Sequence, residues 1–116
     1  MDTFADRFNK MTLTTNSEPQ IFVSCPVKPD TFIYIRAELC AKGMRTNVYF
    51  DIEGVFRHAD GSLTQCGETL IRVIGAPEGS SVELRANNSL IDIVVTGNEE
   101  SIQWKVGSHS AIIENM

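Results

Sequence analysis

Two pairs of carboxylates are the residues of this chain whose type and spacing could support chemistry. Asp51 and Glu53 stand two positions apart in a predicted strand, so their side chains share one face. Glycosidases use two carboxyl groups about 5 to 9 Å apart, a separation that this spacing allows. Glu99 and Glu100 fall in a predicted loop, where acidic oxygens could bind a hard cation. We favour simpler interpretations: acids on an outer strand surface and acids at a solvated loop tip.

The histidines and cysteines form no catalytic or metal-binding pattern. His58 falls at a predicted strand end and His109 between two serines, and we interpret both as solvated residues. Cys25, Cys40 and Cys66 are odd in number and lack the spacing of metal ligands, which favours free thiols. The sequence also lacks motifs for a nucleophilic serine or a phosphate loop. We predict a protein that is not an enzyme and has no catalytic residue, cofactor or metal.

Length and charge narrow the class of protein. The 116 residues suffice for one domain whose core needs neither disulfides nor metals. A net charge of −5 argues against binding to a nucleic-acid backbone or to an anionic membrane surface. No apolar run approaches the roughly 20 residues of a membrane helix, and the acidic N-terminus does not resemble a secretory signal. We expect a protein made in the cytoplasm, with no nucleic-acid or membrane partner.

Residues 89–106 give the clearest structural pattern. Apolar residues alternate with other residues on both sides of a polar loop that contains Gly97 and Asn98. This period of two, with β-branched and aromatic side chains, predicts two antiparallel strands paired as a hairpin. Trp104 is in phase with the apolar set. We therefore place it in the core, where its indole N–H needs a hydrogen-bond partner.

The same alternation recurs along the rest of the chain. Prolines mark residues 20–25 as an edge strand, Gly54 indicates a bulge or a close approach, and Asp60-Gly61 predicts a two-residue hairpin turn. Besides the pair above, strands are predicted at residues 20–25, 31–42, 47–59, 63–75 (bent near residue 66) and 80–86, residues 11–15 are a candidate for one more, and residues 111–113 are candidates to close the last strand. Seven or eight strands without an interior helix predict an all-β fold, an antiparallel, jelly-roll-like β-sandwich.

Five aromatic residues are the candidate contact residues. Residues 1–11 are predicted to form a short arm, with Phe4 and Phe8 on one side, preceding a single β-sandwich domain over residues 12–116. The alternative for the arm is a frayed terminus. Phe32, Tyr34 and Tyr49 lie outside the apolar phase of their strands, which suggests a covered surface. We predict a protein interface that includes all five residues.

Several segments, taken in order, resemble a family of small β-sandwich modules in structural proteins of tailed phages and prophages. The family pattern is a polar stretch before a proline, an aromatic-rich strand, a tyrosine-containing strand ending in Phe-Arg before a glycine turn, and a closing pair of strands. Here these correspond to residues 15–19, 32–39, 49–61 and 91–104. The resemblance covers residues 12–106, and the acidic Glu99-Glu100 departs from the small or basic residues usual in the family.

The resemblance implies a non-enzymatic bacteriophage virion structural protein, made in the host bacterial cytoplasm. A capsid decoration (cement) subunit is our first interpretation. Its partners would be copies of itself, in a homo-oligomer such as a trimer, and other virion proteins such as the major capsid protein, without a small-molecule ligand. One alternative is a tail-fibre or other tail-associated module that contacts a receptor. Another is a carbohydrate-binding module, which would need exposed aromatic side chains.

Overall fold

A computed structural model describes residues 7–8 and 10–116. In this part of the chain nine strands follow one another, and no long helix separates them. They are β1 (Met11–Thr14), β2 (Pro19–Pro26), β3 (Thr31–Lys42), β4 (Asn47–Ala59), β5 (Ser62–Gln65), β6 (Leu70–Ala76), β7 (Ser81–Asn87), β8 (Leu90–Thr96) and β9 (Ile102–Asn115).

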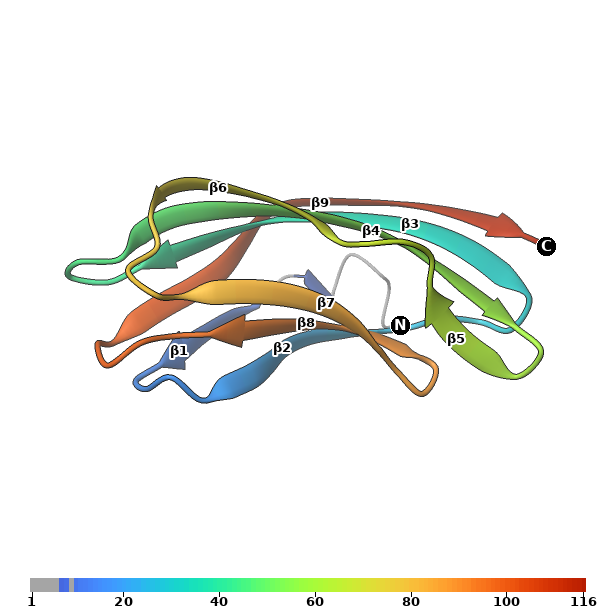
Figure 1. The fold of residues 1–116 in the computed structure, drawn as a ribbon, viewed down its shortest axis with the longest axis horizontal. Helices are drawn as coiled ribbons and strands as arrows, with labels where there is room; N and C mark the ends of the chain where they lie inside the picture. The colour runs from blue at the N-terminus through green and yellow to red at the C-terminus, as the bar shows by residue number, and fades with distance from the viewer. Residues whose placement is uncertain (1–6, 9) are drawn as a thin grey trace.

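The strands form two antiparallel sheets that face each other (Figure 1). The larger sheet has the order β1-β9-β3-β4-β5. Strand β6 pairs with the same edge of β4 as β5 does, with β6 beside the first part of β4 and β5 beside the last part. The smaller sheet has the order β2-β8-β7. The predicted all-β, antiparallel architecture is confirmed and is compatible with a β-sandwich. The proline-flanked strand β2 does lie at a sheet edge, as predicted.

Strands β3 and β4 show why the period of two is informative. Their bounds are those predicted, and they pair without interruption from Thr31 opposite His58 to Lys42 opposite Asn47. Alternate side chains point into the space between the sheets, and the apolar ones among them are at most 2% exposed. In β3 these are Ile33, Ile35, Ala37, Leu39 and Ala41. Their burial, at about 25 cal/mol per Å² of apolar surface, favours the pairing of the two sheets.

The predicted hairpin over residues 89–106 is wrong in its pairing. Both strands exist, but β8 pairs with β2 and β7 in the smaller sheet, whereas β9 pairs with β1 and β3 in the larger sheet. The polar loop at residues 97–101 therefore crosses from one sheet to the other. Gly97 permits a close crossing, since a Cβ there would lie 2.3 Å from the hydroxyl oxygen of Thr14.

Two other predicted strands have different extents. The stretch predicted as one bent strand over residues 63–75 is divided into β5 and β6 at the predicted bend. Conversely, β9 does not stop at Val106 but runs on to Asn115. Gly107 is passed over in the register with β3, because Val106 pairs with Leu39 and Ser108 with Glu38. This bulge lets the strand continue where an interruption was expected.

The core confirms the placement of Trp104. Its side chain is 0% exposed and stacks on Phe50 with ring centroids 5.9 Å apart. The indole N–H donates to the hydroxyl oxygen of Thr14 at 2.9 Å. Gly54 marks the predicted close approach rather than a bulge, because its pairing with Ile35 is regular and a Cβ there would meet Leu84 of the opposite sheet at 2.9 Å.

The hydrogen bond between Thr14 and Trp104 gives a first testable prediction. Thr14→Val keeps the shape but leaves the buried indole N–H without an acceptor, which costs about 1–3 kcal/mol. We expect urea unfolding followed by tryptophan fluorescence to show this loss of unfolding free energy. Thr12→Val, a half-buried threonine of the same strand, is the matched control and should change stability little. Equal effects of the two substitutions would contradict the role of Thr14.

Candidate functional site

The two arm residues of the predicted interface have different outcomes. Phe4 lies outside the residues that the structure describes. Phe8 is 2% exposed, belongs to the chain's own hydrophobic core and stacks on His109, with ring centroids 4.6 Å apart. In this structure the Phe8 ring is therefore covered by its own chain, so its surface is not open to a neighbouring subunit.

The other three predicted residues share the outer face of the larger sheet. Phe32 is 40% exposed, Tyr49 is 50% exposed, and Tyr34 is half-buried. In the pairing of β3 with β4, Phe32 and Tyr34 lie toward one end and Tyr49, opposite Cys40, toward the other. At 3.3 Å per residue, Phe32 and Cys40 are about 26 Å apart along β3. One face carries the three residues, but they do not form one patch.

A band of polar contacts separates the two ends of this face. The guanidinium of Arg36 donates two hydrogen bonds to the carboxylate of Asp51, at 3.0 and 2.8 Å. Next to this pair, the hydroxyl of Tyr34 donates to Glu53 at 2.5 Å. In the middle of the sheet, Asp51 is thus held in an ion pair and Glu53 in a hydrogen bond from a neutral phenol.

Exposed isoleucines that the sequence analysis missed extend both aromatic ends of this face. Ile112 of β9 pairs with Tyr34 and is 59% exposed. Ile74 of β6 pairs with Tyr49 and is 49% exposed. Sequence alternation gives the face of a residue but not the strand beside it, so it could not reveal these neighbours. The outer face therefore has two apolar patches, which we call the Phe32 patch (Phe32, Tyr34 and Ile112) and the Tyr49 patch (Tyr49 and Ile74).

The carboxylates Asp51 and Glu53 do share a face, but their contacts do not suit acid–base catalysis. The hydrogen bonds from Arg36 hold the pKa of Asp51 below its ordinary value, so this group is ionised at neutral pH. Glu53 accepts the hydrogen bond of Tyr34, which raises the pKa of that phenol. A general acid needs a raised carboxyl pKa, and Asp51 has the reverse.

His58 differs from the prediction of a solvated residue, whereas His109 is exposed as predicted. His58 is 4% exposed, and its Nε2 lies 3.0 Å from the hydroxyl of Ser89. It is buried because it pairs with Leu63 of β5 on one side and Thr31 of β3 on the other. His109 is exposed but lies inside β9, with Phe8 against its ring, rather than in a loop.

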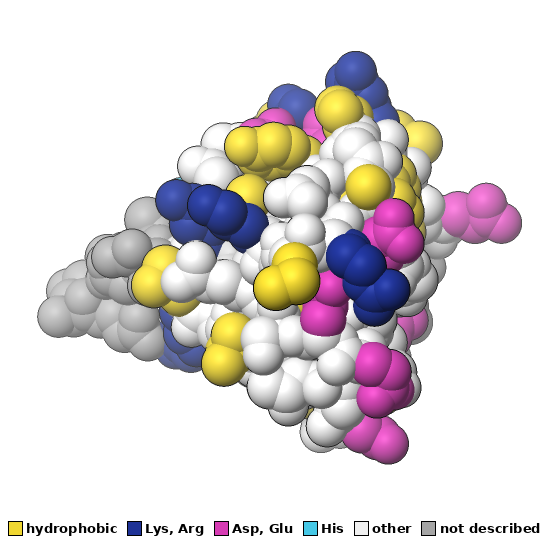
Figure 2. All heavy atoms as spheres, turned by 90° about the vertical axis from the view of Figure 1, so that its left-hand side faces the viewer, with side chains coloured by type: hydrophobic (Ala, Val, Ile, Leu, Met, Phe, Trp, Pro, Cys, Tyr) yellow, Lys and Arg dark blue, Asp and Glu magenta, His cyan; other side chains and the backbone are white. Residues whose placement is uncertain are grey.

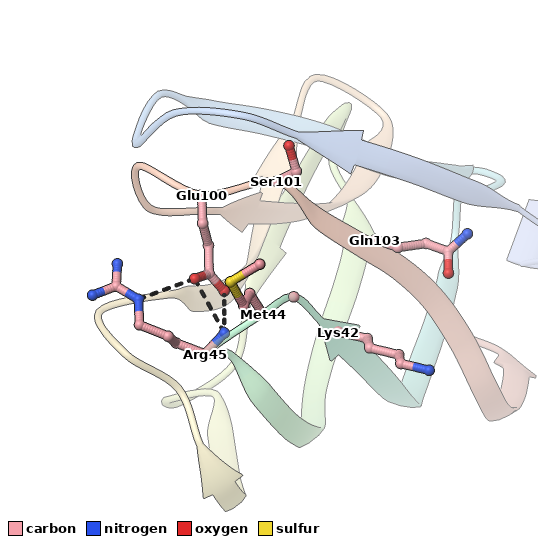
Figure 3. A pocket seen from close by; sticks show the side chains of 7 residues that line it. Lys42, Met44, Arg45, Glu100, Ser101 and Gln103 are labelled. Atoms are coloured by element: carbon pink, nitrogen blue, oxygen red, sulfur yellow. Dashed lines mark hydrogen bonds and ion pairs between the residues drawn. The ribbon is translucent and has the colours of Figure 1, made fainter.

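A pocket of about 790 Å³ lies where the β3–β4 turn meets the crossing loop (Figure 3). Its lining residues are Lys42, Gly43, Met44, Arg45, Glu100, Ser101 and Gln103. Glu100 is the one acidic residue among the lining residues, and its side chain is 13% exposed. It accepts hydrogen bonds from the backbone N–H groups of Thr46 (2.8 Å) and Arg45 (3.1 Å) and from the Arg45 side chain (3.2 Å).

These contacts make Glu100 a structural group. The backbone N–H of Thr46, helped by those from Arg45, lowers the pKa of Glu100 from 4.5 to about 2. The neighbouring Asn98 donates from its amide to the hydroxyl of Thr46 and to the carbonyl of Glu78, both at 2.9 Å. The crossing loop is thereby tied to the β3–β4 turn. A carboxylate already bound in this way has little left to offer a cation.

The end of the molecule around this pocket carries mixed charges. In Figure 2, which looks onto the left-hand side of Figure 1, acidic and basic side chains are interspersed and apolar ones form small separate patches. Within the part of the chain that the structure describes, no three His, Cys, Asp or Glu side chains gather in a group that could hold a metal ion. Over the same residues, no helix is long and apolar enough to cross a membrane.

Comparisons with known proteins found no match to this chain. No family model matches the sequence, no curated protein resembles it, and no solved structure matches the fold closely enough to report. The geometry defines the class: an all-β protein of two antiparallel sheets whose internal polar groups are largely paired and whose outer face exposes apolar side chains.

The pKa of Glu100 gives a prediction about stability and pH. Because the folded-state pKa is about 2 and the ordinary value is 4.5, the carboxylate stabilises the fold fully above pH 4.5 and loses this effect as the pH falls toward 2. We expect Glu100→Gln to unfold at lower urea concentration than the wild type at pH 7, and the two midpoints to converge between pH 4.5 and 2. Glu99→Gln, an exposed control in the same loop, should match the wild type throughout.

The cysteines give a second prediction for this subsection. Burial raises the pKa of the Cys25 thiol to about 12, whereas Cys66 is exposed. Since the thiolate is the reactive form, iodoacetamide at pH 8 should alkylate Cys66 in the folded protein and leave Cys25 unmodified until urea is added. Peptide mass spectrometry distinguishes the two sites. Alkylation of Cys25 at the same rate as Cys66 without urea would contradict its place in the core.

Proposed function

We propose that this chain is a non-enzymatic structural protein of a tailed-phage virion, and that it acts as a capsid decoration subunit. The observation that carries the contact role is the outer face of the larger sheet, where Phe32 is 40% and Tyr49 is 50% exposed. Exposed aromatic side chains on a sheet face are typical of surfaces that another protein covers. The family resemblance of residues 12–106 supports the phage assignment.

The polar groups of the same face support contact rather than turnover. Arg36 pairs with Asp51, and Tyr34 pairs with Glu53. Polar groups that are hydrogen-bonded to each other are less costly to cover with a partner than isolated ones are. Between the Phe32 and Tyr49 patches, a partner would meet an ion pair and a hydrogen-bonded carboxylate.

The partners that fit this proposal are copies of the chain and other virion proteins, above all the major capsid protein. Phage heads present many identical sites in a symmetric lattice, so one contact surface is used repeatedly. The protein would be made in the bacterial cytoplasm and act in the assembled particle. No nucleic-acid, membrane or small-molecule partner is part of the proposal.

The proposal is tested by locating the chain in particles. Phage particles are prepared from the bacterium that encodes it, heads and tails are separated by sedimentation, and the chain is quantified by mass spectrometry against the major capsid protein. We expect it in heads at a fixed ratio to the capsid protein. Recovery with tails instead would favour the tail-associated alternative, and absence from both would contradict the virion role.

A rebinding assay with phage heads tests whether the outer face of the larger sheet is the contact surface. Heads stripped of the chain should rebind the wild type but not a Phe32→Ser, Tyr49→Ser variant. Ile21→Ser is the matched control, since Ile21 is 55% exposed but lies on β2 of the smaller sheet. Rebinding by the double variant would reject this face.

A glycan array with the wild type and Tyr49→Ser tests the carbohydrate-binding alternative. Glycan binding by the wild type that is lost in Tyr49→Ser would support that alternative and contradict the proposal of a decoration subunit.

A further inference from the structure

Among the described residues, the larger sheet has an unpaired edge at β1, at β5, at β6 and along part of β9, and those of β6 and β9 are the longest. Strand β6 pairs with β4 on one side only. On β9, the edge opposite β3 is paired with β1 only over residues 102–105, so the portion from Val106 to Asn115 has no strand beside it there. Unpaired edges present free backbone N–H and C=O groups and are ready to pair with another chain.

Both edges expose apolar side chains on both faces, β6 along most of its length and β9 near its end, unlike a solvated strand. In β6, Leu70 and Ile74 on the outer face are 63% and 49% exposed, and Ile71 and Val73 on the inner face are 42% and 49% exposed. In β9, Ile112 on the outer face and Ile113 on the inner face are 59% and 55% exposed. Figure 1 shows the end of β9 projecting beyond the smaller sheet, so the smaller sheet does not cover it.

We propose that β6 of one copy pairs antiparallel with the C-terminal half of β9 of a second copy, so that the chain assembles head to tail through its larger sheet. The inference concerns these two edges and stands whether or not the chain belongs to a phage particle. Directions agree with it: β6 runs opposite to β4, β4 opposite to β3, and β3 opposite to β9. A copy placed alongside without turning over therefore brings β9 antiparallel to β6, with the outer faces continuous.

One register satisfies both strands. It places Arg72 opposite Glu114 on the outer face, and brings the exposed apolar residues together, with Val73 opposite Ile113 and Ile74 opposite Ile112. Arg72 and Glu114 are both exposed in the isolated chain, so the pairing would add an opposite-charge pair across the strands. Gly75, whose φ is +111°, ends the regular part of β6, and β9 ends at Asn115, so the pairing is assigned to residues 71–74 opposite residues 112–115.

Other registers are less favourable. A shift by one residue puts outer side chains on the inner face. A shift by two places either Arg72 opposite Ile112 or Ile74 opposite Glu114, so that a charge faces an isoleucine in each case. Pairing of β6 with β6 of a second copy is the isologous alternative. Because β6 contains no acid, it would leave Arg72 without an acidic partner across the new strand pair.

The contact is heterologous, because each copy offers two different edges. Such contacts form a closed ring where the rotation between copies closes, and an open filament where it does not. A four-residue strand pair is small beside a standard interface of about 1,600 Å². Ring closure or repetition would supply the remaining stability, because each added copy can bind through both edges.

Two single variants and their mixture test this inference. Val73→Lys adds a charge to the β6 edge and Ile113→Lys adds one to the β9 edge. We expect the wild type to show a mass that is a multiple of the monomer by light scattering after size exclusion, and each variant to associate at least about tenfold more weakly. Mixing the two variants should give a 1:1 dimer and nothing larger, because each variant retains one intact edge.

The control and the contrary outcomes are clear. Ile21→Lys, at an exposed isoleucine on the edge strand β2, should assemble as the wild type does, and circular dichroism and thermal melts should show all three variants folded. A strictly monomeric wild type would overturn the inference, yet would leave the particle assay of the proposed function unaffected. An Ile113→Lys variant that assembles normally would overturn it in favour of β6–β6 pairing.

Discussion

The hydrogen bond between the indole of Trp104 and the hydroxyl of Thr14 is the contact on which the arrangement of the larger sheet depends. Trp104 of β9 is the largest fully buried side chain among the described residues. Its partner on β3 is the small Ala41, which leaves room for the indole. A buried indole N–H requires an acceptor. Thr14 of the short edge strand β1 supplies this acceptor. The strand β1 is therefore attached to the sheet by Trp104, a core residue far away in the sequence. Gly97 of the crossing loop passes against the same hydroxyl.

The crossing loop helps to fix the position of the two sheets relative to each other. It connects β8 of the smaller sheet to β9 of the larger sheet. The side chains of Asn98 and Glu100 in this loop form hydrogen bonds with the β3–β4 turn. Glu100 accepts two backbone N–H groups there, and Asn98 joins Thr46 to the carbonyl of Glu78. The pocket beside these residues follows from this attachment. An acidic pair that suggested a cation site in the sequence instead supplies acceptors for a turn with unpaired donors.

The sequence predicted the faces of the strands better than their partners. Alternation placed β3, β4 and the buried Trp104 correctly, because burial of one face imposes a period of two on the strand itself. Pairing is not encoded locally, so two strands adjacent in sequence were wrongly joined as a hairpin. One sign was present: β8 reads Leu-Ile-Asp-Ile-Val-Val-Thr and is buried on both faces, as expected of a central strand. His58 was likewise assigned to solvent because its neighbours across β5 and β3 are distant in sequence.

The sheet edges differ in how they are protected, and this difference bears on assembly. In the smaller sheet, β2 begins and ends in proline and has a register shift between Ile21 and Val23, two devices that discourage pairing with another chain. Strand β6 and the end of β9 contain neither proline nor lysine, and they expose isoleucine on both faces. Within the described residues, one edge of the smaller sheet is protected while two complementary edges of the larger sheet have no strand partner, which is the asymmetry that directional, head-to-tail assembly requires. The polar pairs of Arg36 and Tyr34 then occupy the middle of the face, where they would separate contacts made at its two ends.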